Sequence, residues 1–311
     1  MSNLPSHHIV PPMRNGVSAS QVFLPDLPQL KTIYQFLCQQ FPHISPQEWQ
    51  QRFNEGLIVT ATGKVLDIHQ TYFCNQHIYY YRFLAHETHV PFEHNIIFEN
   101  DHIIVVDKPH FLTMSPTGKY VQETLLVRLK KQTNNPALTP IHRLDRETAG
   151  IVLFSKQTTS RGVYQQLFAK REVTKTYHAI APYHSHLQFP LNIAYRLVKG
   201  EPFYTMRVVD GLPNSETYID ILEHNHAFAK YLLKPSTGKQ HQLRVHLCQL
   251  NIPIQNDPFY PLIKHKPEDD FNHPLQLLAK EICFIDPISQ QKMQFSSKQE
   301  LTLPLQCNDN E

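Results

Sequence analysis

The chain has 311 residues, of which 41% are hydrophobic and 18% charged, so it can bury one large or two moderate cores and wholesale disorder is excluded. Its five cysteines form no C-x-x-C pair and its 20 histidines are dispersed, which argues against a disulfide framework, a zinc ribbon and a structural metal. A formal net charge of +2 gives only a weak global signal for nucleic acid.

The chain begins with a segment that lacks periodicity. Residues 1–28 are rich in Pro, Ser and Asn, and we expect them to form an extended arm. Residues 30–41 then place apolar side chains at helical spacing. A second short helix is expected to begin after Ser45, a favourable N-cap residue, and to end at Gly56.

Strand signals follow these two helices. Residues 57–66 predict a strand, a turn and a strand, and residues 78–84 predict another strand. Helix, helix and hairpin is the layout of a small S4-like RNA-binding domain, so we assign residues 29–90 to one. The alternative is a helical cap on the main domain.

The rest of the chain, residues 91–311, is expected to be one main domain. It contains predicted strands and amphipathic helices without regular alternation, which favours an α+β fold with a mixed, largely antiparallel sheet and flanking helices. The predicted strands are 103–109, 151–156, 175–183, 229–235 and a later one next to the residues FIDP, and the predicted helices are 123–131 and 159–170.

Charge is distributed unevenly along this domain. Residues 119–175 contain eleven Lys or Arg and four Asp or Glu, whereas residues 201–230 contain five acids and two bases. This contrast predicts a polarised surface, for which phosphate is the commonest partner. Taken alone, a solvated charged surface explains the pattern at least as well.

A charge-dense segment enters an apolar strand at HRLDRETAG, residues 142–150. It places Asp145 at the mouth of the strand, where a rigid element can position a carboxylate beside a pocket. On its own, an aspartate between Arg143 and Arg146 is more often a structural ion pair than a catalytic group.

Four sequence motifs favour a catalytic role for Asp145 over a structural ion pair. Together they resemble the RluA-type pseudouridine synthases, and the N-terminal region is similar to a bacterial subgroup with a degenerate S4-like module. In family order, the motifs are VVDKPHFLTMSPTG (105–118), IHRLDRETAGIVLFSK (141–156), FAKREVTKTYHAI (168–180) and PSTGKQHQLRVHLCQLNIPIQNDPFY (235–260). The resemblance spans about residues 91–290 and implies a pseudouridine synthase catalytic domain.

The resemblance also implies a catalytic set. Asp145 matches the family's catalytic aspartate, and acts either as a nucleophile on C1′ or as a base on C2′ of the ribose. Arg244, which the alternation in HQLRVH places on a strand, would keep this carboxylate charged. Tyr177 matches the tyrosine that stacks on the target base, and taking the C5 proton is a second role that the resemblance implies for it. Without the flanking motifs, Tyr177 would be a simple strand aromatic.

A further set of residues is expected to bind the RNA around an extruded uridine. Arg143 would fill the vacated stack or hold phosphates. His142 and Thr148 would shape the loop, and Lys175 would share a strand face with Tyr177. The complete set is His142, Arg143, Thr148, Lys175, Lys239, His241 and Gln242.

The chain departs from the family pattern at five positions. Lys239 replaces an arginine, and Asn251 and Asn256 replace glycines, although Asn tolerates left-handed backbone better than other residues. Leu278 and Asp286 replace two histidines. These changes lie outside the catalytic set and bear on RNA target choice more than on chemistry.

We therefore predict an RNA pseudouridine synthase, an isomerase of structured RNA, with ribosomal RNA favoured over transfer RNA. No glycine fingerprint or P-loop is present, so no cofactor is expected. We expect a cytoplasmic monomer without membrane association, because the chain has no long apolar run and no secretory signal.

Two alternatives stay open. One is a non-catalytic RNA-binding protein that retains the synthase fold. The other is a hydrolytic glycosidase built on Asp145 and Glu147, which is disfavoured because residues two apart in an extended loop point in opposite directions.

Overall fold

The computed structural model describes residues 10–82, 84 and 86–304, which fold as two compact units. The first contains the described residues up to Glu87 together with Ser115–Pro136, and the second contains Thr88–Met114 and the described residues from Ala137 onward. Cys307, Phe83 of the expected strand and residues 1–9 of the expected arm lie outside the described residues. The S4-like assignment and the boundary at residue 90 stay predictions.

The first unit packs helices against a small antiparallel sheet with strand order β1-β3-β2. Its elements are β1 (Ser20–Leu24), α1 (Ile33–Gln40), α2 (Pro46–Asn54), β2 (Ile58–Thr60), β3 (Gln76–Tyr80) and α3 (Leu125–Thr133). The predicted cap of α2 is confirmed, because the Ser45 side chain accepts a hydrogen bond from the Glu48 N–H in a capping box. Trp49 is fully buried at the centre of the core.

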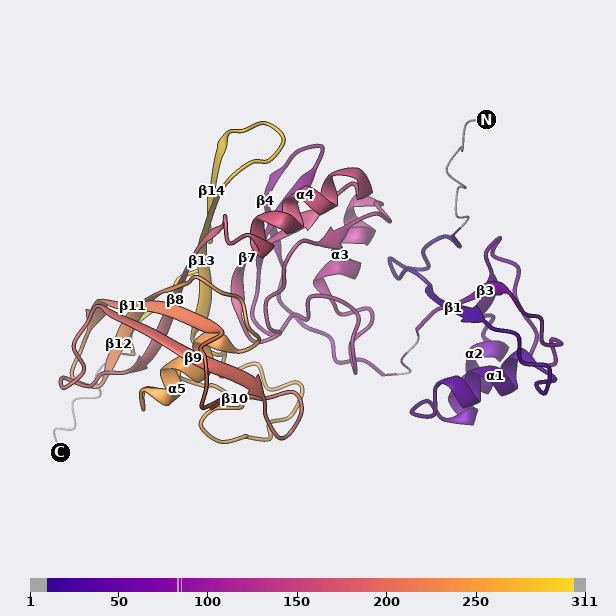
Figure 1. Ribbon diagram of the computed structural model, residues 1–311, viewed down its shortest axis with the longest axis horizontal. Coiled ribbons are helices and arrows are strands. Elements are labelled where there is room, and N and C mark those ends of the chain that lie inside the picture. Colours follow the sequence, from indigo (N-terminus) through magenta and orange to yellow (C-terminus); the bar gives the residue numbers. More distant parts are fainter. Residues whose placement is uncertain (1–9, 83, 85, 305–311) are drawn as a thin grey trace. The chain divides into compact units, whose positions relative to one another are not determined.

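The second unit is built on one mixed sheet of eleven strands, which Figure 1 shows with helices packed against it. The main path runs β10-β9-β11-β12-β8-β13-β7-β5-β4, with β14 beside β13 and β6 beside β7. Only the β13–β7 pair is parallel among the pairings of the described strands, so the predicted α+β fold with a largely antiparallel sheet is confirmed.

The elements of this second unit have the following bounds: β4 (Asn95–Glu99), β5 (Ile103–Lys108), β6 (Thr139–Pro140), β7 (Ala149–Ser155), α4 (Thr158–Ala169), β8 (Thr174–Pro182), β9 (Leu191–Lys199), β10 (Met206–Val209), β11 (Ser215–His224), β12 (Phe228–Pro235), α5 (Gln242–Gln249), β13 (Leu277–Ile285) and β14 (Lys292–Ser296).

Each helix of the second unit covers its own part of the sheet. Tyr164 and Leu167 of α4 share a core cluster with β5 and β7. Leu243 and Leu247 of α5 pack in another cluster with side chains of β8 and β12, such as Tyr231. Removing these apolar surfaces from water fixes both helices on the sheet.

Gly150 determines how closely β7 and β13 approach. Its φ is +109°, and a Cβ at this position would lie 2.2 Å from the carbonyl oxygen of Ala279, its partner in the parallel ladder. We expect Gly150→Ala to destabilise the protein by about 2–5 kcal/mol, because it combines backbone strain with overpacking. Thermal unfolding midpoints would measure this loss.

Gly162 offers a matched control within α4. A Cβ there meets nothing within 4 Å, so Gly162→Ala is expected to raise stability by about 0.5–1 kcal/mol. Equal midpoints for the two variants would contradict the close-approach explanation for Gly150.

Candidate active site

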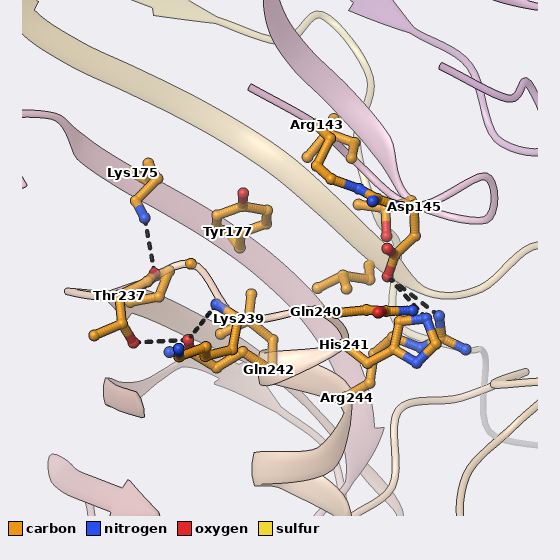
Figure 2. Close-up of a pocket in the computed structure, with 16 residues that line it drawn as sticks. Arg143, Asp145, Lys175, Tyr177, Thr237, Lys239, Gln240, His241, Gln242 and Arg244 are labelled. Atoms are coloured by element: carbon orange, nitrogen blue, oxygen red, sulfur yellow. Dashed lines mark hydrogen bonds and ion pairs between the residues drawn. The ribbon is translucent and has the colours of Figure 1, made fainter. Parts of the chain in front are cut away.

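Three segments of the second unit converge on one pocket. The loop before β7 contributes Asp145, and strand β8 contributes Lys175 and Tyr177. The segment from the end of β12 into α5 contributes Pro235 and residues 237–244. The pocket has a volume of about 140 Å³, and Figure 2 shows the polar side chains around it. A larger cavity of about 600 Å³ shares Arg143, Lys175 and Tyr177 with it.

The carboxylate of Asp145 faces a guanidinium that belongs to a distant segment. Nη1 of Arg244 lies 3.3 Å from Oδ2 of Asp145. The Arg244 side chain is 0% exposed, whereas that of Asp145 is 18% exposed and lines the pocket. The structure therefore places a buried cation behind a carboxylate that a ligand can reach.

Asp257 fixes the orientation of this guanidinium. Its two carboxylate oxygens accept from Nε and Nη2 of Arg244 at 2.8 and 2.7 Å. Burial alone would lower the pKa of Arg244, but the hydrogen bonds to Asp257 and the nearby carboxylate charges outweigh it and raise the pKa. Arg244 therefore stays charged and leaves Nη1 for Asp145.

Arg244 lies on helix α5, so its predicted location on a strand is wrong. The residues QLRVH alternate in polarity, which resembles a strand over so short a window. All residues from Gln242 to Leu247 are buried, however, and Leu243 and Leu247 pack on the sheet at the i, i+4 spacing of a helix. Full burial removes the polar face that would have revealed the helical period.

Glu147 joins the same charge cluster. A hydrogen bond from the Thr148 N–H to the Asp145 carbonyl turns the loop, and Glu147 Oε2 lies 3.9 Å from Arg244 Nη1. The expectation that Asp145 and Glu147 point in opposite directions is therefore wrong, because it assumed an extended segment. Both carboxylates face one guanidinium.

Tyr177 and Lys175 line the pocket from β8. Burial and the charge of Asp145 raise the pKa of Tyr177, which keeps the side chain a neutral phenol. Lys175 Nζ donates to the carbonyl of Thr237 at 2.9 Å. Burial, together with the charge of Arg171, lowers the pKa of Lys175 to about 8. As expected for positions two apart on a strand, both residues line this pocket.

Three of the expected RNA-binding residues are built into the pocket walls, and two of them use their side-chain polar atoms inside the protein. His142 Nε2 accepts from the Leu153 N–H while its ring stacks on Phe168, and Thr148 is buried. Gln242 donates to the Glu216 carbonyl and to Thr217, and its amide oxygen accepts from Thr237 and Lys239. These contacts hold the pocket walls in place.

The other expected residues lie at the rim or beneath it. Arg143 and Lys239 are exposed and line both cavities. His241 is buried, with Nε2 3.7 Å from Asp145 Oδ2. The structure thus brings all the predicted catalytic and RNA-binding residues to one site, although their chemical roles stay predictions.

Two residues that shape the site were not predicted. Asp257 directly follows Asn256 near the end of the last motif, PSTGKQHQLRVHLCQLNIPIQNDPFY, so its position after HQLRVH was a usable signal. Lys108 is fully buried, and its Nζ donates to the carbonyls of Pro109, Leu112 and Arg146, which ties β5 to the Asp145 loop. A lysine with three backbone acceptors has no such signal in sequence.

Comparison with known proteins shows which enzymes have a similar sequence. A family model described as RNA pseudouridylate synthase matches residues 102–249, which include Asp145, Tyr177 and Arg244. The matched segment is similar to this family, and the resemblance found in the motifs is confirmed. The family and the relatives below are RNA pseudouridine synthases, so the protein is an enzyme of the isomerase class.

Individual relatives agree with this assignment. An uncharacterized RNA pseudouridine synthase of Synechocystis sp. is 28% identical over 72% of this chain and 78% of that protein. The tRNA pseudouridine synthase C of Vibrio cholerae is 28% identical over 64% of this chain and 88% of that protein. The structure of human RNA Pseudouridylate Synthase Domain Containing 1 shares the fold, with a TM-score of 0.53, 24% identity and coverage of 67% and 84% of the two chains.

The two asparagines that replace family glycines do adopt left-handed backbone. Asn251 has φ of +61° and Asn256 has φ of +62°. The Asn256 side chain also donates to the Pro274 carbonyl, which further stabilises its turn. The turns of the pseudouridylate synthase motif are therefore kept without glycine.

The two positions where the family has histidines are internal in this chain. Leu278 is fully buried beside Ala149 and Ile180. Asp286 is 2% exposed, and its Oδ2 accepts from the Tyr164 hydroxyl at 2.6 Å. The expected effect of these two replacements on RNA target choice is therefore not supported, since neither side chain is at the surface.

The described part of the chain contains no group of three or more His, Cys, Asp or Glu side chains that could hold a metal ion. Among the helices of the described residues, none is both long and apolar enough to cross a membrane.

Proposed function

We propose that this protein converts a specific uridine in structured RNA to pseudouridine, with Asp145 as the essential carboxylate. In this reaction the C1′–N1 bond breaks, a C1′–C5 bond forms, and the proton on C5 is lost while N1 gains one. The observation that carries the proposal is a pocket-lining carboxylate 3.3 Å from a fully buried guanidinium. A held carboxylate beside the sugar suits attack on C1′ or proton removal from C2′ as positive charge develops there.

The other pocket residues have complementary roles in this proposal. The Tyr177 ring stacks on the extruded uracil, and its raised pKa disfavours a role as the base that takes the C5 proton. Arg143 and Lys239, exposed at the rim, bind phosphates or fill the vacated stack. His142, Thr148 and Gln242 support the RNA-binding surface from within.

We propose that Lys175 contributes a charge to RNA binding. Because its pKa is lowered to about 8, the ammonium is present below pH 8 and is lost as pH rises above it. RNA affinity is therefore expected to fall by about fivefold between pH 7 and 9.5 at constant ionic strength, the effect of one charge-assisted contact. Fluorescence anisotropy with a labelled RNA would measure it.

Lys175→Arg is the matched control, because arginine keeps its charge across this range. Its affinity is expected to stay flat with pH. The same fall in both proteins would assign the titration to another group, such as Lys108, whose pKa is lowered to about 7 by burial.

We propose ribosomal RNA as the first candidate for the RNA that is modified. The Vibrio cholerae relative named tRNA pseudouridine synthase C favours transfer RNA as the second. Mapping pseudouridines in ribosomal and transfer RNA from cells with and without this protein decides between them. A map unchanged in both RNA classes would contradict the proposed function.

The two competing functions have distinct products. A non-catalytic RNA-binding protein would retain RNA affinity but release no tritium from C5-labelled uridine. A hydrolytic glycosidase would release free uracil instead of forming pseudouridine. We propose that the 29–90 region adds RNA contacts as an S4-like domain, and that the protein acts as a cytoplasmic monomer.

A further inference from the structure

His241 occupies an unusual position at the start of α5. It is the N-cap residue with φ of +53°, yet its side chain makes no capping hydrogen bond to the helix. Its ring instead lies between Tyr260 and Asp145, with Nδ1 2.9 Å from the Tyr260 hydroxyl and Nε2 3.7 Å from Asp145 Oδ2. The left-handed backbone thus directs a buried imidazole toward the catalytic carboxylate.

The hydrogen bonds of Tyr260 determine where the imidazole proton lies. The Tyr260 oxygen accepts the Met206 N–H at 2.8 Å, so its single proton can be donated to His241 Nδ1. Burial raises the pKa of Tyr260 to about 12, which keeps that proton in place near neutral pH. Nδ1 is then an acceptor, and a neutral imidazole must carry its proton on Nε2.

The imidazole is neutral at physiological pH. The pKa of His241 is lowered to about 4, mainly by burial and also by the charges of Arg244 and Arg143. The charges of Asp145 and Asp257 act in the opposite direction without reversing the shift. The ring therefore presents an N–H to Asp145 and does not add a second full positive charge beside Arg244.

The Arg244 guanidinium and the His241 imidazole face the same carboxylate oxygen of Asp145. Arg244 Nη1 and His241 Nε2 face Oδ2 of Asp145, and neither contact involves Oδ1 (Figure 2). The 3.7 Å separation is longer than a hydrogen bond, but catalytic hydrogen bonds are often long before substrate binds and tighten in the complex.

We infer that His241, in the tautomer set by Tyr260, is a positioning residue that holds Oδ2 of Asp145 together with Arg244 and leaves Oδ1 to react with the sugar. This inference rests on the proposed role of Asp145. It assigns Oδ1 of Asp145 to the reaction. It also connects the site, through His241 and Tyr260, to the backbone N–H of Met206 at the start of β10.

Selective ¹⁵N-histidine labelling of the full chain tests the tautomer without any assay of activity. The His241 signals, assigned by their loss in His241→Leu, are expected to show protonated Nε2 and unprotonated Nδ1 at pH 7. Tyr260→Phe removes the donor to Nδ1 and is expected to shift the ring toward a mixture of tautomers. A ring with protonated Nδ1 in the wild type would overturn the inference.

Tritium release tests the positioning role. His241→Leu is expected to lower kcat by about 10- to 100-fold, the effect of one hydrogen bond to a charged group, with KM changed less than about threefold. His241→Gln, whose amide can donate in place of Nε2, is expected to recover part of that loss.

His246→Gln is the matched control on the same helix. His246 is also buried, but its Nε2 pairs with Ser215 and away from the pocket, so kcat is expected to stay within about twofold even if stability falls. Wild-type kcat in His241→Leu would overturn the inference, whereas a wild type that releases no tritium would overturn the proposed function itself.

Discussion

Asp145→Asn is expected to remove pseudouridine formation while the protein stays folded and binds RNA. The substitution keeps the shape of the side chain and an oxygen that can accept from Arg244, but it removes the charge and the basicity. Loss of a general base alone costs about 10²–10⁴-fold in rate, and loss of a nucleophile costs more. We therefore expect turnover to fall by at least about 10³-fold, measured as tritium release from C5-labelled uridine in RNA.

Glu147→Gln provides the comparison, because Glu147 also faces Arg244 Nη1, at 3.9 Å. Its removal takes a charge from the same cluster but leaves the Asp145 carboxylate in place, so turnover is expected to fall by less than about tenfold. Asp145→Asn activity within tenfold of wild type would contradict the assignment of the reactive group. A larger loss in Glu147→Gln than in Asp145→Asn would transfer that role to Glu147.

The sequence motifs predicted which residues lie together in the site, but not all the secondary-structure elements on which those residues lie. The segment HRLDRETAG located Asp145 beside an apolar strand, and HQLRVH located its cation, because family resemblance carries long-range pairing that periodicity does not. Helix α5 was interpreted as a strand since its buried residues hide the helical period. The turn that brings Glu147 to Arg244 is closed by a backbone hydrogen bond at Thr148 and tied to β5 by Lys108, and no local propensity specifies these contacts.

The strands of the second unit with long apolar runs were predicted, and two strands with mixed burial were missed. The apolar runs of β5 and β7 are fully buried and were predicted from their β-branched composition. Strands β9 and β11 mix buried, half-buried and exposed residues, and β1 lies in the segment expected to be an extended arm. Their pairing partners, distant in sequence, decide their structure.

The inward orientation of His142 and Gln242 also follows from tertiary contacts. Polar residues within a nucleic-acid-binding motif suggest contact with the RNA. Here, however, both side chains form hydrogen bonds with backbone groups around the pocket, His142 with the Leu153 N–H and Gln242 with the Glu216 carbonyl. Their positions in the motifs are consistent with either role, so only the partners seen in the structure separate a wall residue from a contact residue.

Substitutions at Arg244 and Asp257 are expected to distinguish the structural role of the buried Arg244 cation from its role in catalysis. Arg244→Met leaves Asp257, a carboxylate with 0% side-chain exposure, without its partner, and breaking such a buried pair costs about 3–5 kcal/mol. Arg244→Met/Asp257→Asn removes both charges, and Asn can still accept from the Phe259 and Tyr260 N–H groups that Asp257 now binds. The urea midpoint of the double variant is therefore expected to recover much of the loss, whereas tritium release stays low because Asp145 still lacks its cation. Recovery of both quantities would show that Arg244 serves only the fold, and recovery of neither would show that the pair is needed for a reason other than charge balance.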